Sequence, residues 1–211
     1  MTVIAFDLDG TLIDCKARQI TVLRVILKAL HIDNVNYEEI WNLKREGFTT
    51  KDALILGGVD PETATQIQRN WEQVIEDWKW LSLDTVFYDT LPVLKMLKER
   101  NVCIGVVTAR QSQRLASLQM QQLGLMPFIS MFEVVDPLFA STAKAEVLKS
   151  WKVEVFIGDT EIDFQAATLA KVFFVGLSRG QRSRDYLIRS GVNIIYETLE
   201  AAMARLCIFQ T

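Results

Sequence analysis

The sequence predicts an α/β protein built on a doubly wound parallel sheet, with a separate all-α domain inserted into it. Short apolar runs of strand length alternate with segments of helical spacing over most of the chain, an order typical of a parallel sheet with helices on both faces. The apolar runs are unbroken, as expected of strands buried on both faces. Only residues 15–85 break this rhythm, because they show helical spacing and no clear strand.

The predicted elements of the α/β domain follow one another in chain order. The strands are expected at 2–6, 102–107, 153–157 and 172–177, with a further edge strand at 193–196. The helices are expected at 90–100, 111–123, 141–150, 161–170, 183–190 and 198–207. Residues 15–85 contain the predicted helices 19–30 and 61–80. We therefore predict an α/β domain of residues 1–14 and 86–211 and an inserted helical cap of residues 15–85.

Four of the five tryptophans lie in the predicted cap, and they are Trp41, Trp71, Trp78 and Trp80. We expect them to pack the small core that the cap needs for itself. A surface for stacking nucleic-acid bases is the less favoured alternative.

Composition narrows the class of protein. The chain has 211 residues, of which 50% are hydrophobic and 23% are charged, and its formal net charge is −3. These values are typical of a soluble globular protein. No basic run could follow a nucleic-acid backbone, no apolar stretch reaches the length of a membrane span, and the N-terminus lacks the pattern of a signal peptide. We therefore expect neither a nucleic-acid nor a membrane partner.

The cysteines and the single histidine exclude further classes. Cys15, Cys103 and Cys207 are far apart and show no CxxC spacing, which indicates the reduced thiols of a cytoplasmic protein rather than a disulfide frame or a zinc site. His31 is the only histidine, so mechanisms that need a histidine triad or a histidine-rich metal site are nearly excluded.

Two carboxylates follow the first predicted strand in the stretch AFDLDGTLID. Asp7 lies just past the carboxyl end of that strand, where parallel sheets bind ligands, and Asp9 follows two residues later. Gly10 permits a tight turn, and a solvated Asp-Gly turn is the alternative interpretation. A calcium loop of the EF-hand type does not fit, because the glycine falls at the fourth position instead of the sixth and no glutamate stands at the twelfth.

Similar polar groups stand at or near the ends of later strands. The motifs are VVTAR, with Thr108 and Arg110, and FIGDTEID, with Asp159 and Asp163, while Lys144 precedes the second motif on a predicted helix. Each cluster alone could be a turn or a helix cap, as Asp159 with Thr160 illustrates. Together, carboxylates, a hydroxyl and a lysine at one sheet edge predict a site for Mg²⁺ and phosphate.

These motifs resemble a known family. DLDGT, VVTAR, Lys144 and GDTEID match, in order, the four motifs of the haloacid dehalogenase (HAD) superfamily of hydrolases. The helical block resembles the inserted α-helical cap of that superfamily, and the α/β domain its Rossmann-like core. Residues 175–203 resemble the end of its phosphoglycolate phosphatase-like members.

The resemblance implies a role for each motif residue. Asp7 would be the nucleophile that becomes an aspartyl-phosphate, and Asp9 would protonate the leaving group and later deprotonate the attacking water. Lys144 would neutralise negative charge on Asp7 and in the transition state. The Asp7 carboxylate, the Asp9 backbone carbonyl, Asp159 and Asp163 would hold Mg²⁺.

Substrate contacts are implied for three residues after the second strand. Thr108 and the amide of Ala109 would hold the phosphoryl oxygens, and Arg110 could pair with a carboxylate or second phosphate of the substrate. Lys149 is the alternative to Lys144 as the third motif, since many relatives have Lys-Pro there and this chain reads STAKAEVLK.

Within the cap, LKREGFTTKDAL (43–54) resembles the loop that reaches over the active site in relatives with this cap type. Its residues Arg45, Thr50 and Lys51 could contact an anionic group of the substrate. A polar connection with solvated charges is an equally good interpretation.

The function that follows is a cytoplasmic, Mg²⁺-dependent phosphatase. Its substrate would be a small phosphorylated metabolite, a phosphomonoester such as a phosphoglycolate-like compound or a sugar phosphate. A phosphosugar mutase of the same superfamily and a phospho-accepting regulatory protein are the alternatives. The sequence does not indicate an oligomeric state.

Overall fold

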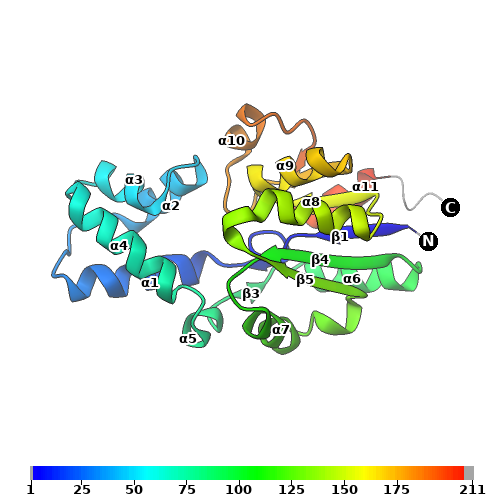
Figure 1. The fold of residues 1–211 in the computed structure, drawn as a ribbon, viewed down its shortest axis with the longest axis horizontal. Coiled ribbons are helices and arrows are strands. Elements are labelled where there is room, and N and C mark those ends of the chain that lie inside the picture. The colour runs from blue at the N-terminus through cyan, green and yellow to red at the C-terminus, as the bar shows by residue number, and fades with distance from the viewer. Residues whose placement is uncertain (1, 207–211) are drawn as a thin grey trace.

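The computed structural model describes residues 2–206 and contains a six-stranded sheet with helices on both faces (Figure 1). The strand order is β5-β4-β1-β6-β7-β8, and all neighbouring strands are parallel. The strands are β1 Val3–Phe6, β4 Cys103–Ala109, β5 Met131–Val135, β6 Val155–Gly158, β7 Phe173–Leu177 and β8 Ile195–Tyr196. The predicted doubly wound α/β fold is therefore confirmed.

The two faces of the sheet carry separate apolar layers. Ile4 and Phe6 point to the face covered by α6, α7 and α11, whereas Ala5 points to the face covered by α8, α9 and α10. This alternation is the period of two that a strand imposes, and both faces are apolar because both are buried. The helices are α6 Thr90–Glu99, α7 Gln113–Gln122, α8 Ala140–Ser150, α9 Glu161–Ala170, α10 Arg184–Arg189 and α11 Leu199–Arg205, with short 3₁₀ turns at Met126–Phe128 and Pro137–Phe139.

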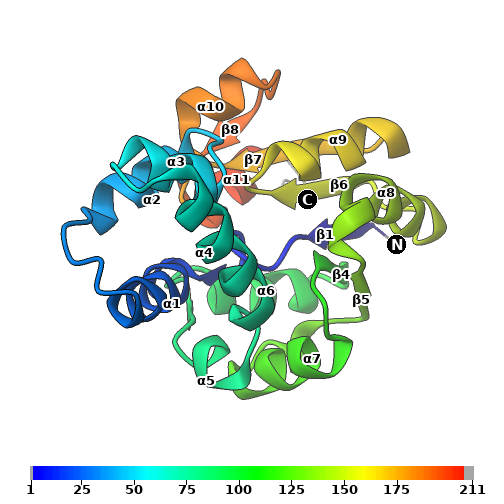
Figure 2. The ribbon, with the colours of Figure 1, turned by 60° about the vertical axis from the view of Figure 1, so that its left-hand side comes forward.

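The inserted segment forms a group of helices to one side of the sheet (Figure 2). These helices are α1 Lys16–Ala29, α2 Tyr37–Arg45, α3 Thr50–Leu56, α4 Pro61–Val74 and α5 Trp78–Leu81. They have an apolar core of their own, which includes Leu27, Leu54 and Ile67. Trp71 packs against this core, and Trp41 is buried.

A two-stranded antiparallel ribbon marks the passage between the two parts. It pairs β2, Ile13–Asp14, with β3, Thr85–Val86. The predicted domain boundary 14/15 lies at the end of β2, and the predicted boundary 85/86 lies within β3. The division into residues 1–14 with 86–211 and residues 15–85 stays a prediction.

Some elements differ from those expected. The sequence prediction missed β5, an edge strand whose side chains are mostly half-buried and include the exposed Glu133, so its apolar pattern is weak. The helix expected at 61–80 is two helices, because the chain turns at 75–77 and Asp77 has extended backbone angles. The strand at 193–196 lies at the sheet edge as predicted.

Two of the cysteines, Cys15 and Cys103, are buried free thiols. Cys207, which is also the last residue of the helix expected at 198–207, lies outside the described residues. Among the helices of residues 2–206, we find none with the length and apolarity needed to span a bilayer.

Candidate active site

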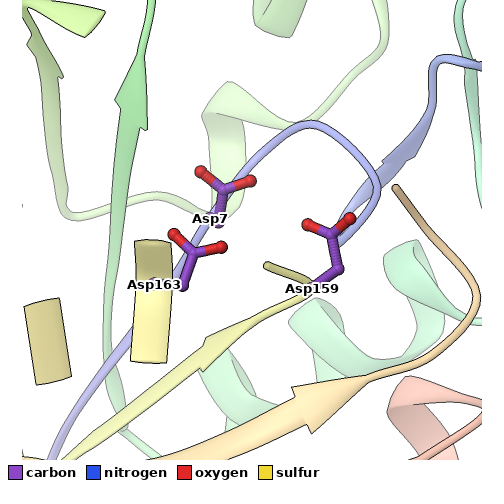
Figure 3. A group of neighbouring side chains, drawn as sticks. All are labelled: Asp7, Asp159 and Asp163. Carbon is purple, nitrogen blue, oxygen red and sulfur yellow. The ribbon is translucent and has the colours of Figure 1, made fainter. Parts of the chain in front are cut away.

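Three buried carboxylates meet where β1 and β6 end (Figure 3). Asp7 directly follows β1, Asp159 directly follows β6, and Asp163 lies in the first turn of α9. One oxygen from each lies within 4.8 Å of the others. β1 and β6 are neighbours in the sheet, so parallel pairing brings their carboxyl ends, and with them Asp7 and Asp159, together.

Gly10 allows the loop after β1 to pass close to Asp159. Its φ is +79°, a conformation that glycine adopts readily, and a Cβ at this position would overlap with the Asp159 carboxylate. The next residue, Thr11, then donates its hydroxyl to Asp159 Oδ1 at 3.0 Å. The Gly-Thr pair of the first motif therefore both makes room for Asp159 and orients it.

Lys144 is the cation of this cluster. Its amine lies 2.6 Å from Asp7 Oδ1 and 2.6 Å from Asp163 Oδ1, and the side chain is buried. Burial opposes the charged form, but the charges of Asp163 and Asp7 outweigh it and raise the pKa of Lys144 above its ordinary value. Lys149, five residues later on the same helix, is exposed and takes no part in these contacts.

Asp163 also belongs to the helix cap of α9. Thr160 is the N-cap, and its hydroxyl accepts from the Asp163 amide at 3.3 Å, while Asp163 Oδ2 accepts from the Thr160 amide at 3.1 Å. This reciprocal arrangement is a capping box. Thus Thr160, and not Asp159, caps the helix, which leaves Asp159 for the acidic cluster.

Asp159 has no cation among its partners in the described chain. Its Oδ2 accepts from the backbone amide of Gln181 at 2.6 Å, and its Oδ1 accepts from Thr11. Burial raises the pKa of Asp159 well above its ordinary value, and the charges of Asp7 and Asp163 act in the same direction. Likewise, burial raises the pKa of Asp7 to about 7 despite Lys144.

This donor set fits a divalent cation. The three carboxylates face a single ammonium group, so the cluster carries excess negative charge in a buried place. Hard oxygen ligands suit Mg²⁺, which binds one or two carboxylates and keeps other positions for water or substrate oxygens. Asp7, Asp159 and Asp163 could therefore hold Mg²⁺, and the Asp9 backbone carbonyl stays a predicted ligand.

The Asp9 side chain belongs to a different charge network. Its Oδ2 lies 2.6 Å from Arg110 Nε, its Oδ1 lies 2.7 Å from Arg110 Nη2, and Arg18 binds the same Oδ1. Burial would raise the pKa of Asp9, but Arg110 and Arg18 outweigh it and hold the pKa below its ordinary value. Arg110 therefore pairs with Asp9 in this structure, where the sequence prediction had it pair with the substrate.

Arg18 is a site residue that the sequence prediction missed. It lies in the first turns of α1, is 3% exposed, and also binds Asp84 Oδ1 through Nε at 3.1 Å. Its neighbour on the same helix, Arg24, is exposed. The sequence around the two arginines does not distinguish them. They differ because the rest of the fold brings the carboxylates of Asp9 and Asp84 to Arg18.

The predicted phosphate-binding residues lie at the end of β4. Thr108 and Ala109 are the last two residues of this strand, which is the other neighbour of β1. Thr108 is buried and Ala109 is half-buried. Arg110 follows Ala109 in the chain, and its backbone amide donates to Val135 O at 3.1 Å.

The cap residues singled out in the sequence have different surroundings. Arg45 donates to the backbone carbonyls of Ser178 and Arg182 in the core. Thr50 is buried and accepts a hydrogen bond from Lys44, and the amide of Lys51 donates to Gln68. Arg45 thus ties the cap to the core.

A cavity of about 230 Å³ lies between the cap and the core. Its core wall includes Asp9, Ala109 and Gln181, and its cap wall includes Gln19 and Trp71. The cavity therefore begins at the predicted acid Asp9 and the predicted phosphate-binding residue Ala109, and extends to the cap.

Comparisons with known proteins match this fold over nearly its whole length. A phosphoglycolate phosphatase of Synechococcus elongatus is 22% identical over 204 residues, which cover 94% of this chain and 93% of that protein. A haloacid dehalogenase-like family hydrolase from Streptococcus pneumoniae superposes with a TM-score of 0.75 at 18% identity, covering 98% of both chains. A predicted phosphatase from Clostridium acetobutylicum gives a TM-score of 0.73 at 18% identity over 97% of each chain.

The family model for haloacid dehalogenase-like hydrolases matches residues 4–177. This range begins in β1 and ends with β7, so it contains the acidic cluster, Lys144 and the whole inserted cap. The chain therefore belongs to the haloacid dehalogenase-like hydrolase family.

Proposed function

We propose that this chain is a Mg²⁺-dependent phosphatase that hydrolyses a small phosphomonoester through an aspartyl-phosphate on Asp7. The observation that carries the proposal is the separation of two neighbouring carboxylates into different networks. Asp7 belongs to the buried acidic cluster with Lys144, and Asp9 lies at the cavity with Arg110 and Arg18. A nucleophile and an acid–base group need such different surroundings.

Asp7 is suited to attack phosphorus as a carboxylate. Lys144 holds one of its oxygens, so the nucleophile is oriented and its charge is partly neutralised. Mg²⁺ bound by the acidic cluster would neutralise charge on the phosphate and on Asp7. Thr108 and the Ala109 amide, at the neighbouring strand end, would bind phosphoryl oxygens.

Asp9 is suited to accept a proton from the attacking water. It lines the cavity, and as a carboxylate held by two arginines it has the form required of the base that takes a proton from the attacking water. The earlier step, transfer of the phosphoryl group to Asp7, requires Asp9 in its protonated form, because Asp9 then donates its proton to the leaving alkoxide.

The size of the cavity favours a small substrate. Its volume of about 230 Å³ lies below the range of roughly 300–1,000 Å³ that is usual for drug-sized ligands. A phosphomonoester with a leaving group of a few carbon atoms fits such a space. The phosphoglycolate phosphatase of Synechococcus elongatus, the relative at 22% identity, supports a substrate of this size.

The proposal is tested by phosphate release from p-nitrophenyl phosphate, phosphoglycolate and a hexose phosphate, with Mg²⁺ or with EDTA. We expect Asp7→Asn to lower kcat more than about 1,000-fold, and Asp9→Asn to lower it about 100- to 10,000-fold. The exposed Asp33 in the cap supplies the matched control, Asp33→Asn, which leaves kcat unchanged.

Two results would contradict the proposal. Full activity of Asp7→Asn would exclude the aspartyl-phosphate, and undiminished activity in EDTA would exclude the Mg²⁺ requirement. Conversion of the hexose phosphate into an isomer without release of phosphate would instead support the mutase.

A further inference from the structure

A closed ring of hydrogen-bonded side chains begins and ends at Asp9. One of the two arginines that bind Asp9, Arg18, also donates through Nε to Asp84 Oδ1 at 3.1 Å. The other, Arg110, also donates through Nη2 to Gln119 Oε1 at 3.1 Å. Gln119 closes the ring, because its Nε2 donates to Asp84 Oδ2 at 2.8 Å. The two arginines of Asp9 therefore have a second pair of partners, which also bind each other.

The ring joins three distant parts of the chain. Arg18 belongs to α1 of the cap, Asp84 lies in the connection between α5 and β3, and Gln119 belongs to α7 of the core. Gln119 Nε2 also donates to Leu81 O at 2.7 Å, which places α7 beside α5 (Figure 2). Both N–H donors and the carbonyl of the Gln119 amide thus have partners, so its orientation is fixed.

The outer pair of the ring, Asp84 and Gln119, acts on the arginines and not on a ligand. Their exposed fractions are 4% and 2%, and neither is among the described residues that line the cavity between cap and core. The two carboxylates of the ring face two guanidinium groups, so its charges balance. Removing one partner of a buried charge leaves that charge uncompensated, and the guanidinium group then turns toward other partners.

The position of Asp9 matters most in the hydrolysis of the aspartyl-phosphate. In that step a water oxygen attacks phosphorus, a proton of the water passes to Asp9, and the bond between phosphorus and the Asp7 oxygen breaks. Both oxygens of Asp9 accept N–H groups of Arg18 and Arg110. The direction in which Asp9 presents its remaining lone pairs to the water therefore depends on where the two guanidinium groups lie.

We propose that Asp84 and Gln119 are positioning residues that orient Asp9, through Arg18 and Arg110, for hydrolysis of the aspartyl-phosphate. The inference rests on the proposed function and adds to it two residues outside the cavity. Without the Asp84 carboxylate, Arg18 loses the partner of its Nε. Without Gln119, Arg110 loses a partner of its Nη2, and Asp84 loses the amide that holds its other oxygen.

Pre-steady-state hydrolysis of p-nitrophenyl phosphate with Mg²⁺ separates the two half-reactions. Burial raises the pKa of Asp84 to about 7, so the assay at pH 8 keeps this carboxyl ionised. p-Nitrophenolate leaves without a proton, so its release reports the attack by Asp7, whereas turnover also requires the water step. We expect Asp84→Asn and Gln119→Met to lower kcat about 10- to 100-fold, toward the lower end of what loss of a base costs.

The same two variants should change kcat/KM for p-nitrophenyl phosphate less than about threefold, because this ratio reports steps up to the release of p-nitrophenolate. A burst of p-nitrophenolate that approaches one equivalent per chain should precede turnover, since the aspartyl-phosphate accumulates. A merely structural role would instead lower kcat and kcat/KM together and give no burst. That result in both variants, or a native kcat in both, would overturn the inference.

Three further variants serve as controls. Gln121→Met changes an exposed glutamine of α7, Asp33→Asn changes an exposed aspartate of the cap, and neither should alter kcat or the burst. The double variant Arg18→Met with Asp84→Asn should turn over no more slowly than Arg18→Met alone, because Asp84 acts through Arg18. Additive losses in the double variant would contradict this route.

NMR of the arginine Nε–H groups separates the inference from the proposed function, because it needs no turnover. The Arg110 Nε–H donates to Asp9 in the native chain, and its signal is assigned by its loss in Arg110→Met. We expect Gln119→Met to speed its exchange with water at least about tenfold, and Gln121→Met to leave it unchanged.

The outcomes of the two experiments differ for the two claims. Faster exchange in Gln119→Met, without phosphate release by the native chain, would support the positioning of Asp9 and contradict the phosphatase mechanism. An unchanged exchange rate in Gln119→Met would overturn the inference alone, whatever the native chain hydrolyses.

Discussion

Asp7 and Asp9 stand two residues apart in the chain, yet their carboxylates belong to different charge networks. Residues i and i+2 of a continued strand would face the same side. Here β1 ends at Phe6, and the loop turns back so that the Leu12 amide bonds to Leu8 O at 2.9 Å. The turn leaves Asp7 among carboxylates and sends Asp9 to Arg110 and Arg18.

Removing Arg110 should change the proton affinity of Asp9. Arg110 lowers the pKa of Asp9, so Arg110→Met should move that pKa upward. The limb of the pH profile of kcat/KM that reports Asp9 should then move to higher pH. Arg114→Met, which removes an exposed arginine of α7, is the control, and an unmoved limb in Arg110→Met would contradict the assignment.

At the scale of elements, the segment 178–183 joins the cap to the acidic cluster. Arg45 of α2 donates to carbonyls of this segment, and the Ser183 amide donates to Arg45 O at 2.9 Å. The same segment supplies the Gln181 amide to Asp159 at 2.6 Å. A Cβ at Gly180 would overlap with Asp159, so the segment can approach this closely only with glycine there.

Breaking this connection should loosen the cap. Arg45→Met removes the donors to Ser178 O and Arg182 O, so we expect faster amide hydrogen exchange in α2 and in residues 178–183, and a KM raised about 3- to 30-fold. Arg69→Met removes an exposed cap arginine and should leave both unchanged. Native exchange rates in Arg45→Met would show that other contacts hold the cap.

At the scale of the whole molecule, a cap with its own apolar core lies to one side of an α/β core with two apolar layers. The cavity lies between the two parts, and the acidic cluster lies at the strand ends on the core side. Burial raises the pKa of Asp7 to about 7 and that of Asp159 well above its ordinary value. Ionisation of these two carboxyl groups therefore lowers the free energy of unfolding.

Thermal unfolding should report this cost. A carboxyl with a raised pKa in the folded state binds more protons there than in the unfolded state, so the free energy of unfolding falls as pH rises from 3.8 to about 7. We expect Mg²⁺ at a hundredfold excess over its Kd to raise the Tm at pH 8 by about 5 to 10 °C. At pH 5.5 and the same Mg²⁺ concentration, the increase in Tm should be smaller, because protons compete with Mg²⁺ for the carboxylates.

Asp159→Asn supplies the check on the source of this effect. It removes a buried charge, so its Tm without Mg²⁺ should exceed that of the native chain at pH 8, and the increase on adding Mg²⁺ should disappear. A native-like response of Asp159→Asn to Mg²⁺ would place the cation elsewhere.

The sequence predicted where the candidate site residues lie in the fold better than it predicted which residues they contact. Asp7, Thr108 and Asp159 were placed at strand ends because β1, β4 and β6 are continuous apolar runs, which are local signals. The edge strand β5 was missed, since its half-exposed side chains give no such run. The break between α4 and α5 was missed because helical spacing continues through it.

By itself, the sequence determined the alternation of strands and helices in the α/β part apart from β5, the presence of an inserted helical segment, and the motif residues that follow the strands. Only the tertiary structure decided which charges meet. Lys144 binds Asp7 across 137 residues, and Arg110 binds Asp9 across 101. Periodicity is a local property of the chain, whereas a charge partner depends on which distant segments the fold brings together.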